Sequence, residues 1–397
     1  MTGGLQIIGL DEVIAKRNGS VDPAKFPSEV FELLSIPAFD SGLPQITVGA
    51  EIRSTKQVVQ EGDVLLSKIV PHIRRAWVVK PTTNHRLIAS GEWIVFRDSR
   101  FEPGYLRHLL TADRFHRQFM QTVSGIGGSL LRARPAEVAK IKVVLPPKKD
   151  QRRIAAILDK ADSLRRKRQD AIRLADEFLR AVFIDMFGDP ETNPKSFDKG
   201  TIRDLVSSAN YGTSEKASEQ IGQFPILRMN NITYKGGWDF SSLKYVDLDE
   251  ASAHKYLAQK GDLLFNRTNS KELVGKTAVY MRDEPMAIAG YLVRVRMNEH
   301  GNSHYVSGYL NSKHGKRTLE ARAKSIVGMA NINAQEMQDI PLLLPPIDLQ
   351  DKYAGIVDAV QKRLKKHHAF GREADAINAA LSEKFFGYIG EKVEELC

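Results

Sequence analysis

The sequence predicts an α+β protein made of two copies of one mixed α/β domain, held apart by two long antiparallel helices that form a coiled coil. Three observations support this prediction. The second half of the chain repeats landmarks of the first half at a constant offset of 199 residues. Strand-like and helix-like runs follow one another in unequal order within each copy, as they do in α+β domains. A long run with helical periodicity follows each copy.

Short motifs that recur at the same spacing define the repeat. Leu-Pro-Pro, three further residues and a glutamine occupy 145–151 and again 344–350. Gly-Asp recurs at 62–63 and 261–262, and Phe-Gly at 187–188 and 386–387. Self-similarity at this period indicates two structurally equivalent halves in a pseudo-two-fold tandem repeat. We therefore expect domains at 1–145 and 191–344, and helical regions at 146–190 and 345–397.

Apolar runs bounded by Gly, Pro and Asn predict the strands of each copy. In the first copy these are 45–52, 63–69, 75–80 and 92–97, followed by a helix from Pro103. In the second copy they are 261–267, 276–281 and 291–296, followed by a helix around 305–321.

The run after each proline pair predicts a long helix. Apolar residues from Ile154 to Val182 recur at alternating three- and four-residue steps, which is the heptad pattern of a coiled coil. Asp150 and Asp348 are the expected N-caps. A second apolar stripe lies beside the heptad seam and consists of Leu158, Ile172, Leu179 and Met186. Because one stripe is enough to pair the two long helices, we expect the second stripe to bind a protein partner.

Composition restricts the possible functions. With 42% hydrophobic and 27% charged residues, the chain has the composition of a globular protein, and its net charge of +10 favours a polyanionic partner. The single cysteine, Cys397, excludes disulfides within the chain and thiolate metal sites. Without a signal-peptide pattern or an apolar run of membrane-span length, we expect a cytoplasmic protein that does not bind a membrane. No residue spacing predicts a catalytic site or a metal site.

Basic and amide side chains gather in loops at matched positions of the two copies. Lys and Arg bind phosphates, and Arg and Asn also recognise base edges in the major groove. The loops therefore predict nucleic-acid binding. The candidate residues are Lys68, His72, Arg74, Arg75, Arg132 and Arg134 in the first copy, and Arg267, Asn269, Lys271, Lys276, Asn331 and Asn333 in the second.

Two variable domains, each followed by Leu-Pro-Pro…Gln and a long helix that ends in Phe-Gly, resemble the specificity subunit of type I restriction-modification systems over essentially the whole chain. The resemblance implies that each domain is a target-recognition domain for one half of a bipartite, asymmetric site in double-stranded DNA. It implies that the helices set the spacer and bind two adenine methyltransferase (modification) subunits, which bring S-adenosylmethionine. It also implies that restriction subunits can join with ATP and Mg, and that this chain has no cofactor and no catalytic activity of its own.

Two other interpretations remain open on the sequence alone. The first is a two-headed nucleic-acid-binding scaffold that is not tied to restriction-modification, which competition between specific duplex, random duplex and RNA would distinguish. The second is an autonomous modification enzyme or nuclease with an unrecognised site, which methyl transfer or cleavage by the purified chain would establish.

Overall fold

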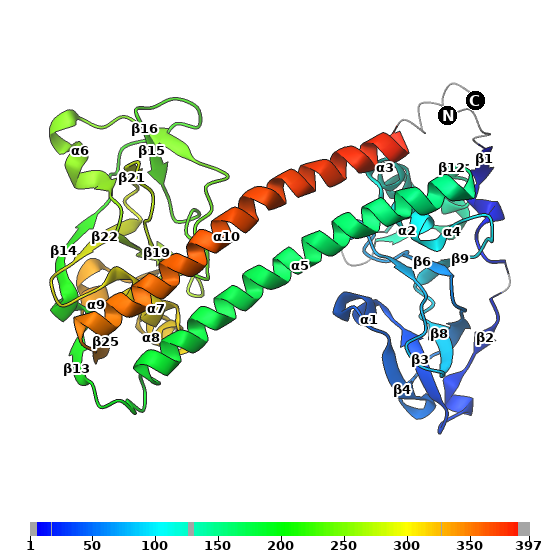
Figure 1. Ribbon diagram of the computed structural model, residues 1–397, viewed down its shortest axis with the longest axis horizontal. Helices are drawn as coiled ribbons and strands as arrows, with labels where there is room; N and C mark the ends of the chain where they lie inside the picture. The colour runs from blue at the N-terminus through cyan, green and yellow to red at the C-terminus, as the bar shows by residue number, and fades with distance from the viewer. Residues whose placement is uncertain (1–5, 17, 126–130, 327, 388–397) are drawn as a thin grey trace. The chain divides into compact units, whose positions relative to one another are not determined.

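The computed structural model describes residues 6–16, 18–125, 131–326 and 328–387, and the chain divides into two compact units (Figure 1). Unit 1 comprises residues 1–169 and 368–397, and unit 2 comprises residues 170–367. Each unit contains one mixed α/β domain and a part of both long helices, α5 (Lys148–Phe187) and α10 (Ile347–Ser382). The side chains at 366–375, where the expected seam of the second helix continues, lie outside the described residues.

The domain of unit 1 is built on two sheets. An antiparallel three-stranded sheet has the order β7-β6-β9, with β6 (Val64–Ser67) between β7 (Ala76–Val78) and β9 (Trp93–Phe96). A five-stranded sheet has the order β2-β5-β8-β3-β4, and within it only β3 and β8 pair in parallel. Its strands are β2 (Ser20–Val21), β5 (Lys56–Val58), β8 (Arg86–Ala89), β3 (Val30–Leu34) and β4 (Gln45–Val48).

Two strand pairs and four short helices complete unit 1. The pairs are β1 (Gln6–Gly9) with β12 (Lys142–Leu145), and β10 (Val123–Ser124) with β11 (Arg132–Ala133). The helices are α1 (Ile36–Ser41), α2 (Pro103–Thr111), α3 (Asp113–Gln121) and α4 (Pro135–Val138).

Unit 2 repeats this plan. The sheet β14-β22-β18-β20 corresponds to the three-stranded sheet of unit 1, and β16-β15-β21-β17 corresponds to the five-stranded one. The strands of these two sheets are β14 (Val206–Tyr211), β22 (Leu292–Met297), β18 (Leu263–Asn266), β20 (Thr277–Val279), β16 (Lys244–Val246), β15 (Phe224–Leu227), β21 (Met286–Ile288) and β17 (Leu257–Ala258). As in unit 1, one pair, β15 with β21, is parallel.

Most of the remaining elements of unit 2 have counterparts in unit 1, but α6 has none. The strands are β13 (Asp198–Thr201), which pairs with β25 (Pro341–Leu344), and the sheet of β19 (Thr268–Asn269), β24 (Met329–Asn331) and β23 (Lys324–Ile326). The helices are α6 (Glu250–Tyr256), α7 (Ser303–Asn311), α8 (Lys313–Arg322) and α9 (Ala334–Gln338). The mainly antiparallel sheets, repeated in both units, confirm the predicted α+β class.

The repeated glutamine joins each long helix to its domain. The Gln151 side chain is 1% exposed; its Oε1 accepts a hydrogen bond from the Glu102 amide at 2.7 Å. Its Nε2 donates to the carbonyl oxygens of Arg100 at 3.0 Å and Pro146 at 2.8 Å. The amide of Gln151 thus holds the residue before α2 and the first turn of α5 together.

Gln350 makes the same three contacts in unit 2. Its Oε1 accepts from the Asn302 amide at 2.9 Å, and its Nε2 donates to the carbonyls of His300 and Pro345, both at 2.9 Å. The Leu-Pro-Pro…Gln motif therefore recurs because it encodes a hydrogen-bonded joint between a domain and the helix that follows it.

Aromatic residues fix the long helices in each unit. In unit 2, Phe187 at the end of α5 packs against Tyr353 of α10, with ring centroids 5.5 Å apart, and against Tyr305 of α7 at 4.7 Å. In unit 1, Phe386, in the segment Glu383–Gly387 after α10, packs on Tyr105 of α2 at 5.7 Å. Within unit 2 the end of one long helix lies beside the beginning of the other, which is an antiparallel arrangement.

Three expectations about local structure need correction. The helix expected around 305–321 is two helices, because Ser312 ends α7 and its hydroxyl accepts from the Gly315 amide at 3.0 Å to cap α8. Asp150 and Asp348 are not N-caps: both lie inside the first turn, since α5 begins at Lys148 and α10 at Ile347. The strand expected at 45–52 ends at Val48, where a 3-10 turn (Gly49–Glu51) begins.

Candidate nucleic-acid interface

In each domain, an ion pair with a buried aspartate lies at the start of the strand that leads to the candidate loop. Gly62 and Gly261 have positive φ values of 87° and 94°, which turn the chain into the following aspartate. Asp63 accepts two hydrogen bonds of 2.7 Å from Arg97, and Asp262 accepts two from Arg296, at 2.8 and 3.3 Å. These pairs connect the start of β6 to β9 and the start of β18 to β22. The Gly-Asp motif is therefore structural, and the candidate loops leave the far ends of β6 and β18.

In unit 1, two of the sequence-predicted loops lie side by side. Ile69 pairs with Arg132 in an antiparallel bridge, the Val70 amide donates to the Leu131 carbonyl at 3.2 Å, and the Ala133 amide donates to the Lys68 carbonyl at 2.8 Å. The loop 67–75 and the loop 131–135 thus form one continuous surface.

Unit 2 brings its two matched loops together in the same way. β19 pairs with β24, with Thr268 opposite Asn331, and the Ile332 amide donates to the Arg267 carbonyl at 2.9 Å. Asn331 Nδ2 also donates to the Thr268 hydroxyl at 2.7 Å. The same long-range pairing in both units is the main structural support for these loops as one functional surface.

Most of the candidate side chains in unit 1 are available to a ligand. His72, Arg74, Arg132 and Arg134 are exposed and Lys68 is half-buried. Arg74 forms an ion pair with Asp113, and Arg132 forms one with Glu92 at 3.2 Å. Exposed pairs of this kind contribute about 0–1 kcal/mol, so an incoming phosphate can replace the carboxylate.

Arg75 does not belong to this available set. It is 8% exposed and donates two parallel hydrogen bonds to Asp40, at 2.8 and 2.9 Å. The hydrogen bonds from Arg75 hold the pKa of the Asp40 carboxyl below its usual range. The expectation that Arg75 is a surface DNA contact is wrong, because its guanidinium is committed to its own domain.

Two candidates in unit 2 are also engaged within the domain. Lys276 is buried, its Nζ donates to the Met229 carbonyl at 2.6 Å, and burial lowers the pKa of its amine. Asn333 is the N-cap of α9, where its Oδ1 accepts from the amides of Gln335 and Glu336, both at 2.9 Å. We therefore correct the prediction for Lys276 and assign a structural role to Asn333.

The other candidates of unit 2 line the loop surface. Lys271 is exposed, Asn269 is half-buried, and the Arg267 guanidinium carbon lies 4.7 Å from the centre of the Tyr211 ring. Tyr211, which sequence reasoning missed, is 42% exposed at the end of β14 and accepts a hydrogen bond from the Ala334 amide at 3.1 Å. An exposed aromatic ring beside an arginine is suited to contact with a nucleic acid base. Its position depends on the long-range pairing of β14 with β22, so local sequence carried no signal for it.

The expected second stripe on α5 is not a free docking face. Leu158 is 2% exposed in the core of unit 1, and Leu179 and Met186 pack against the core of unit 2, while Ile172 is half-buried. This stripe is the face of the helix that packs on the domains, so the basis for assigning it to a partner was wrong. The large apolar side chains of α5 that are exposed are Leu164, Leu174, Phe178 and Ile184.

The described residues contain no group of three or more His, Cys, Asp or Glu side chains placed to hold a metal ion. No helix within the described part of the chain has the length and apolar character needed to cross a membrane.

The chain resembles known proteins in both sequence and fold. Residues 194–369 match the family described as type I restriction modification DNA specificity domain. The chain is 22% identical over 306 residues to the type I restriction enzyme EcoKI specificity subunit of Escherichia coli K12, a match that covers 72% of this chain but only 65% of that relative.

Two solved structures share the fold over nearly the whole chain. The type I restriction-modification S subunit from M. genitalium has a TM-score of 0.62 at 12% identity and covers 96% of both chains. A chain from a structure concerned with complex assembly and conformational transition of the type I R-M system has a TM-score of 0.52 at 20% identity, covering 96% of this chain and 97% of that one. The family match over residues 194–369 and the fold shared over nearly the whole chain thus make this chain similar to type I restriction-modification specificity subunits.

Proposed function

We propose that this chain gives sequence specificity to a type I restriction-modification complex, with each unit recognising one half of a bipartite site in double-stranded DNA. The observation that carries the proposal is the pairing of a basic loop with a second loop that carries Arg or Asn side chains, far apart in sequence, at the same place in both units. A net charge of +10 supports a phosphate-rich ligand.

The two units offer different chemistry to the DNA, which supports an asymmetric site. The loop pair of unit 1 presents Lys68, His72 and three arginines, Arg74, Arg132 and Arg134. The loop pair of unit 2 presents Arg267, Asn269, Lys271 and Asn331, with Tyr211 alongside. Arginine prefers the guanine edge and asparagine the adenine edge, so two identical half-sites are not expected.

We further propose that the chain binds two methyltransferase subunits and, in the full complex, restriction subunits. In this division of labour the partners bring S-adenosylmethionine, ATP and Mg and carry out the catalysis, while this chain holds no cofactor. The exposed apolar side chains of α5 support a protein partner there: Leu174 and Phe178 lie one turn apart and are 54% and 51% exposed. Large apolar side chains at adjacent turns of a helix are suited to burial against another protein.

The test is co-expression with the cognate modification subunit, followed by mapping of methylated adenines in genomic DNA. We expect methylation at one bipartite sequence with unlike halves. Exchange of residues 267–271 for the corresponding loop of another family member should change only one half of that sequence. A palindromic site would contradict two different readers, and methyl transfer by the purified chain alone would contradict the division of labour.

A further inference from the structure

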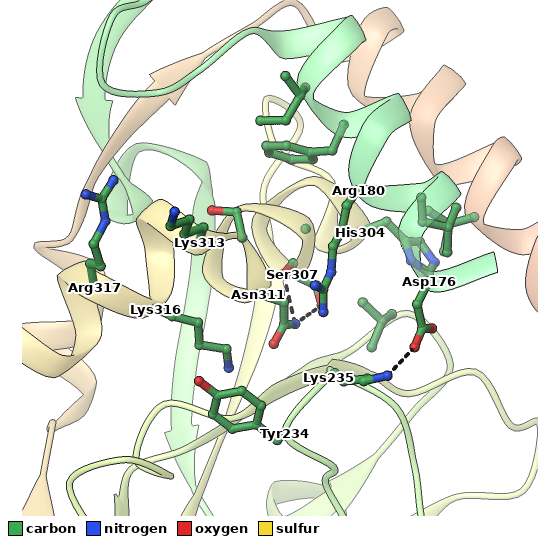
Figure 2. A pocket seen from close by; sticks show the side chains of 18 of the residues that line it. Asp176, Arg180, Tyr234, Lys235, His304, Ser307, Asn311, Lys313, Lys316 and Arg317 are labelled. Carbon is green, nitrogen blue, oxygen red and sulfur yellow. Dashed lines mark hydrogen bonds and ion pairs between the residues drawn. The ribbon is translucent and has the colours of Figure 1, made fainter. Parts of the chain in front are cut away.

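Unit 2 contains a pocket of about 740 Å³ between α5, α7, α8 and the loops 234–236 and 271–274 (Figure 2). Part of its wall is apolar and is formed by Leu179, Phe183 and Val274. Its charged lining is mainly cationic, with three carboxylates, Asp176, Glu272 and Glu320, against the cations Arg180, Lys235, Lys271, Lys313, Lys316 and Arg317. The size of the pocket is typical of a ligand site, and its many cations favour an anionic ligand.

Lys316 is an unpaired cation in this pocket. Its Nζ is excluded from solvent, has no hydrogen-bond partner among the described residues and lies 4.7 Å from the centre of the Tyr234 ring. Burial, together with the charges of Lys276 and Arg180, lowers the pKa of the Lys316 amine to about 8. A charged, buried amine without a hydrogen-bond partner is costly, so a bound anion would stabilise it.

No carboxylate among the described residues forms an ion pair or a hydrogen bond with the Lys316 amine. Asp176 instead pairs with Lys235 at 3.1 Å. Figure 2 shows the Arg180 side chain directed toward Asn311, whereas Arg317 points away and pairs with Glu191 at 3.1 Å. The charge of Arg180 helps to lower the pKa of the Lys316 amine, so the pocket holds two like charges near one another.

The polar groups around Lys316 also fit an anion. Ser312 and Lys313 begin α8 beside the pocket, so the positive end of this ten-residue helix is near the two cations. The Asn311 side chain is held by bonds from its Nδ2 to the Thr277 carbonyl at 2.9 Å and the Ser307 carbonyl at 3.0 Å. Its Oδ1 is buried without a partner among the described residues, and it can accept a hydrogen bond from a protonated oxygen of the ligand.

We propose that this pocket binds a phosphate group, with Lys316 and Arg180 as its charged contacts. A phosphate carries about −1.5 to −2 charges near pH 7, which matches two or three cations better than a single carboxylate does. The pocket is also much larger than one phosphate, and its apolar wall leaves room for the molecule that carries the group. The proposal goes beyond base recognition by the loop pairs. The phosphate belongs either to the DNA backbone or to a free phosphorylated compound.

The test uses the full chain and three variants. Lys316→Met removes the buried charge at similar volume, Arg180→Gln removes its neighbour, and Lys199→Met removes an exposed cation elsewhere in unit 2 as the control. Calorimetric titration with inorganic phosphate and pyrophosphate should show one site in the native chain and in Lys199→Met. We expect affinity to fall at least about tenfold in Lys316→Met and in Arg180→Gln. Near pH 8, binding should also take up a proton, because the anion favours the charged amine.

Loss of binding through misfolding is distinguishable, because removal of an unpaired buried charge should raise the melting temperature of Lys316→Met. A second titration, with specific and random duplex DNA, identifies the source of the phosphate. If Lys316→Met weakens both duplexes equally and lowers the salt slope by about one, the DNA backbone occupies the pocket. If duplex binding is unchanged while pyrophosphate binding is lost, a free phosphorylated compound occupies it.

The proposal is overturned if Lys316→Met and Lys199→Met bind pyrophosphate and both duplexes alike. It is also overturned if Lys316→Met loses only the binding of an acidic peptide such as polyglutamate, because the pocket would then be a protein-docking site. Neither result would affect the base preference of the loop pairs, so the proposed DNA specificity stands or falls separately.

Discussion

Replacing Gln151 with alanine should weaken the joint between α5 and the domain of unit 1. The change removes three hydrogen bonds of 2.7, 3.0 and 2.8 Å from a side chain that is only 1% exposed. A buried polar group that loses its partner costs about 1–3 kcal/mol. Water can reach the Arg100 carbonyl, which belongs to an exposed residue, so we count two groups and expect a loss of about 2–6 kcal/mol. Gln151→Glu should be at least as harmful, because its carboxylate would face two carbonyl oxygens.

Urea unfolding and hydrogen exchange measure this effect together. In Gln151→Ala the midpoint should fall, and the amide of Glu102, which donates to Gln151, should exchange faster. Gln350→Ala should do the same to the amide of Asn302 in unit 2. Gln169 is exposed on the same helix, so Gln169→Ala should change stability by no more than about 0.5 kcal/mol. If the Glu102 amide keeps its native protection in Gln151→Ala, the reasoning about the joint is refuted.

Four further predictions concern substitutions elsewhere in the chain. Lys316→Met should stabilise the chain by up to about 3 kcal/mol below pH 8, as measured by thermal unfolding. The gain should disappear as the pH rises to 10.5, because the pKa of the Lys316 amine is about 8 in the folded chain and 10.5 in the unfolded chain. A gain that is the same at every pH would contradict this prediction. Lys68→Ala and Lys271→Ala should weaken all duplexes equally and lower the salt slope by about one each in binding titrations, whereas a change in base preference would assign them to base contacts. The double change Leu174→Asp and Phe178→Asp should abolish co-elution with the modification subunit on size-exclusion chromatography, and an unchanged complex would exclude this face of α5 as the binding surface. Leu158→Ala should instead destabilise unit 1 by about 2–5 kcal/mol. Arg75→Gln should lower the stability of unit 1 without changing the base preference at any position of the DNA site. If methylation mapping shows a relaxed base preference in this variant, Arg75 is a DNA contact after all.

The repeated motifs predicted the architecture well because part of each motif's role is local. Gln151 bonds to Pro146, five residues away, and the Gly-Asp turn at 62–63 depends on the conformation of a single glycine. The break in the helix expected around 305–321 was missed, although Ser312 is a typical N-cap residue in the run Asn-Ser-Lys.

The candidate site was only partly predictable, because availability depends on distant partners. Arg75 is buried by Asp40, which lies 35 residues away in sequence, and Lys276 by the carbonyl of Met229, 47 residues away. Helical periodicity likewise locates an apolar stripe but not what covers it, so Leu158 had the pattern of a free face. Lys316 had no signal at all, since an unpaired amine is defined by the absence of a neighbouring acid in three dimensions.

All six partners of Gln151 and Gln350 are backbone atoms. Any residue can offer a main-chain amide or carbonyl, so the joint makes almost no demand on which side chains the attached domain carries. A domain with quite different loops could be substituted at 146 or 345 and still lock onto its helix through the same three bonds. If each unit reads one half-site as proposed, exchange of a whole domain that keeps the apolar residues packed on the helices would change the specificity in a single genetic step.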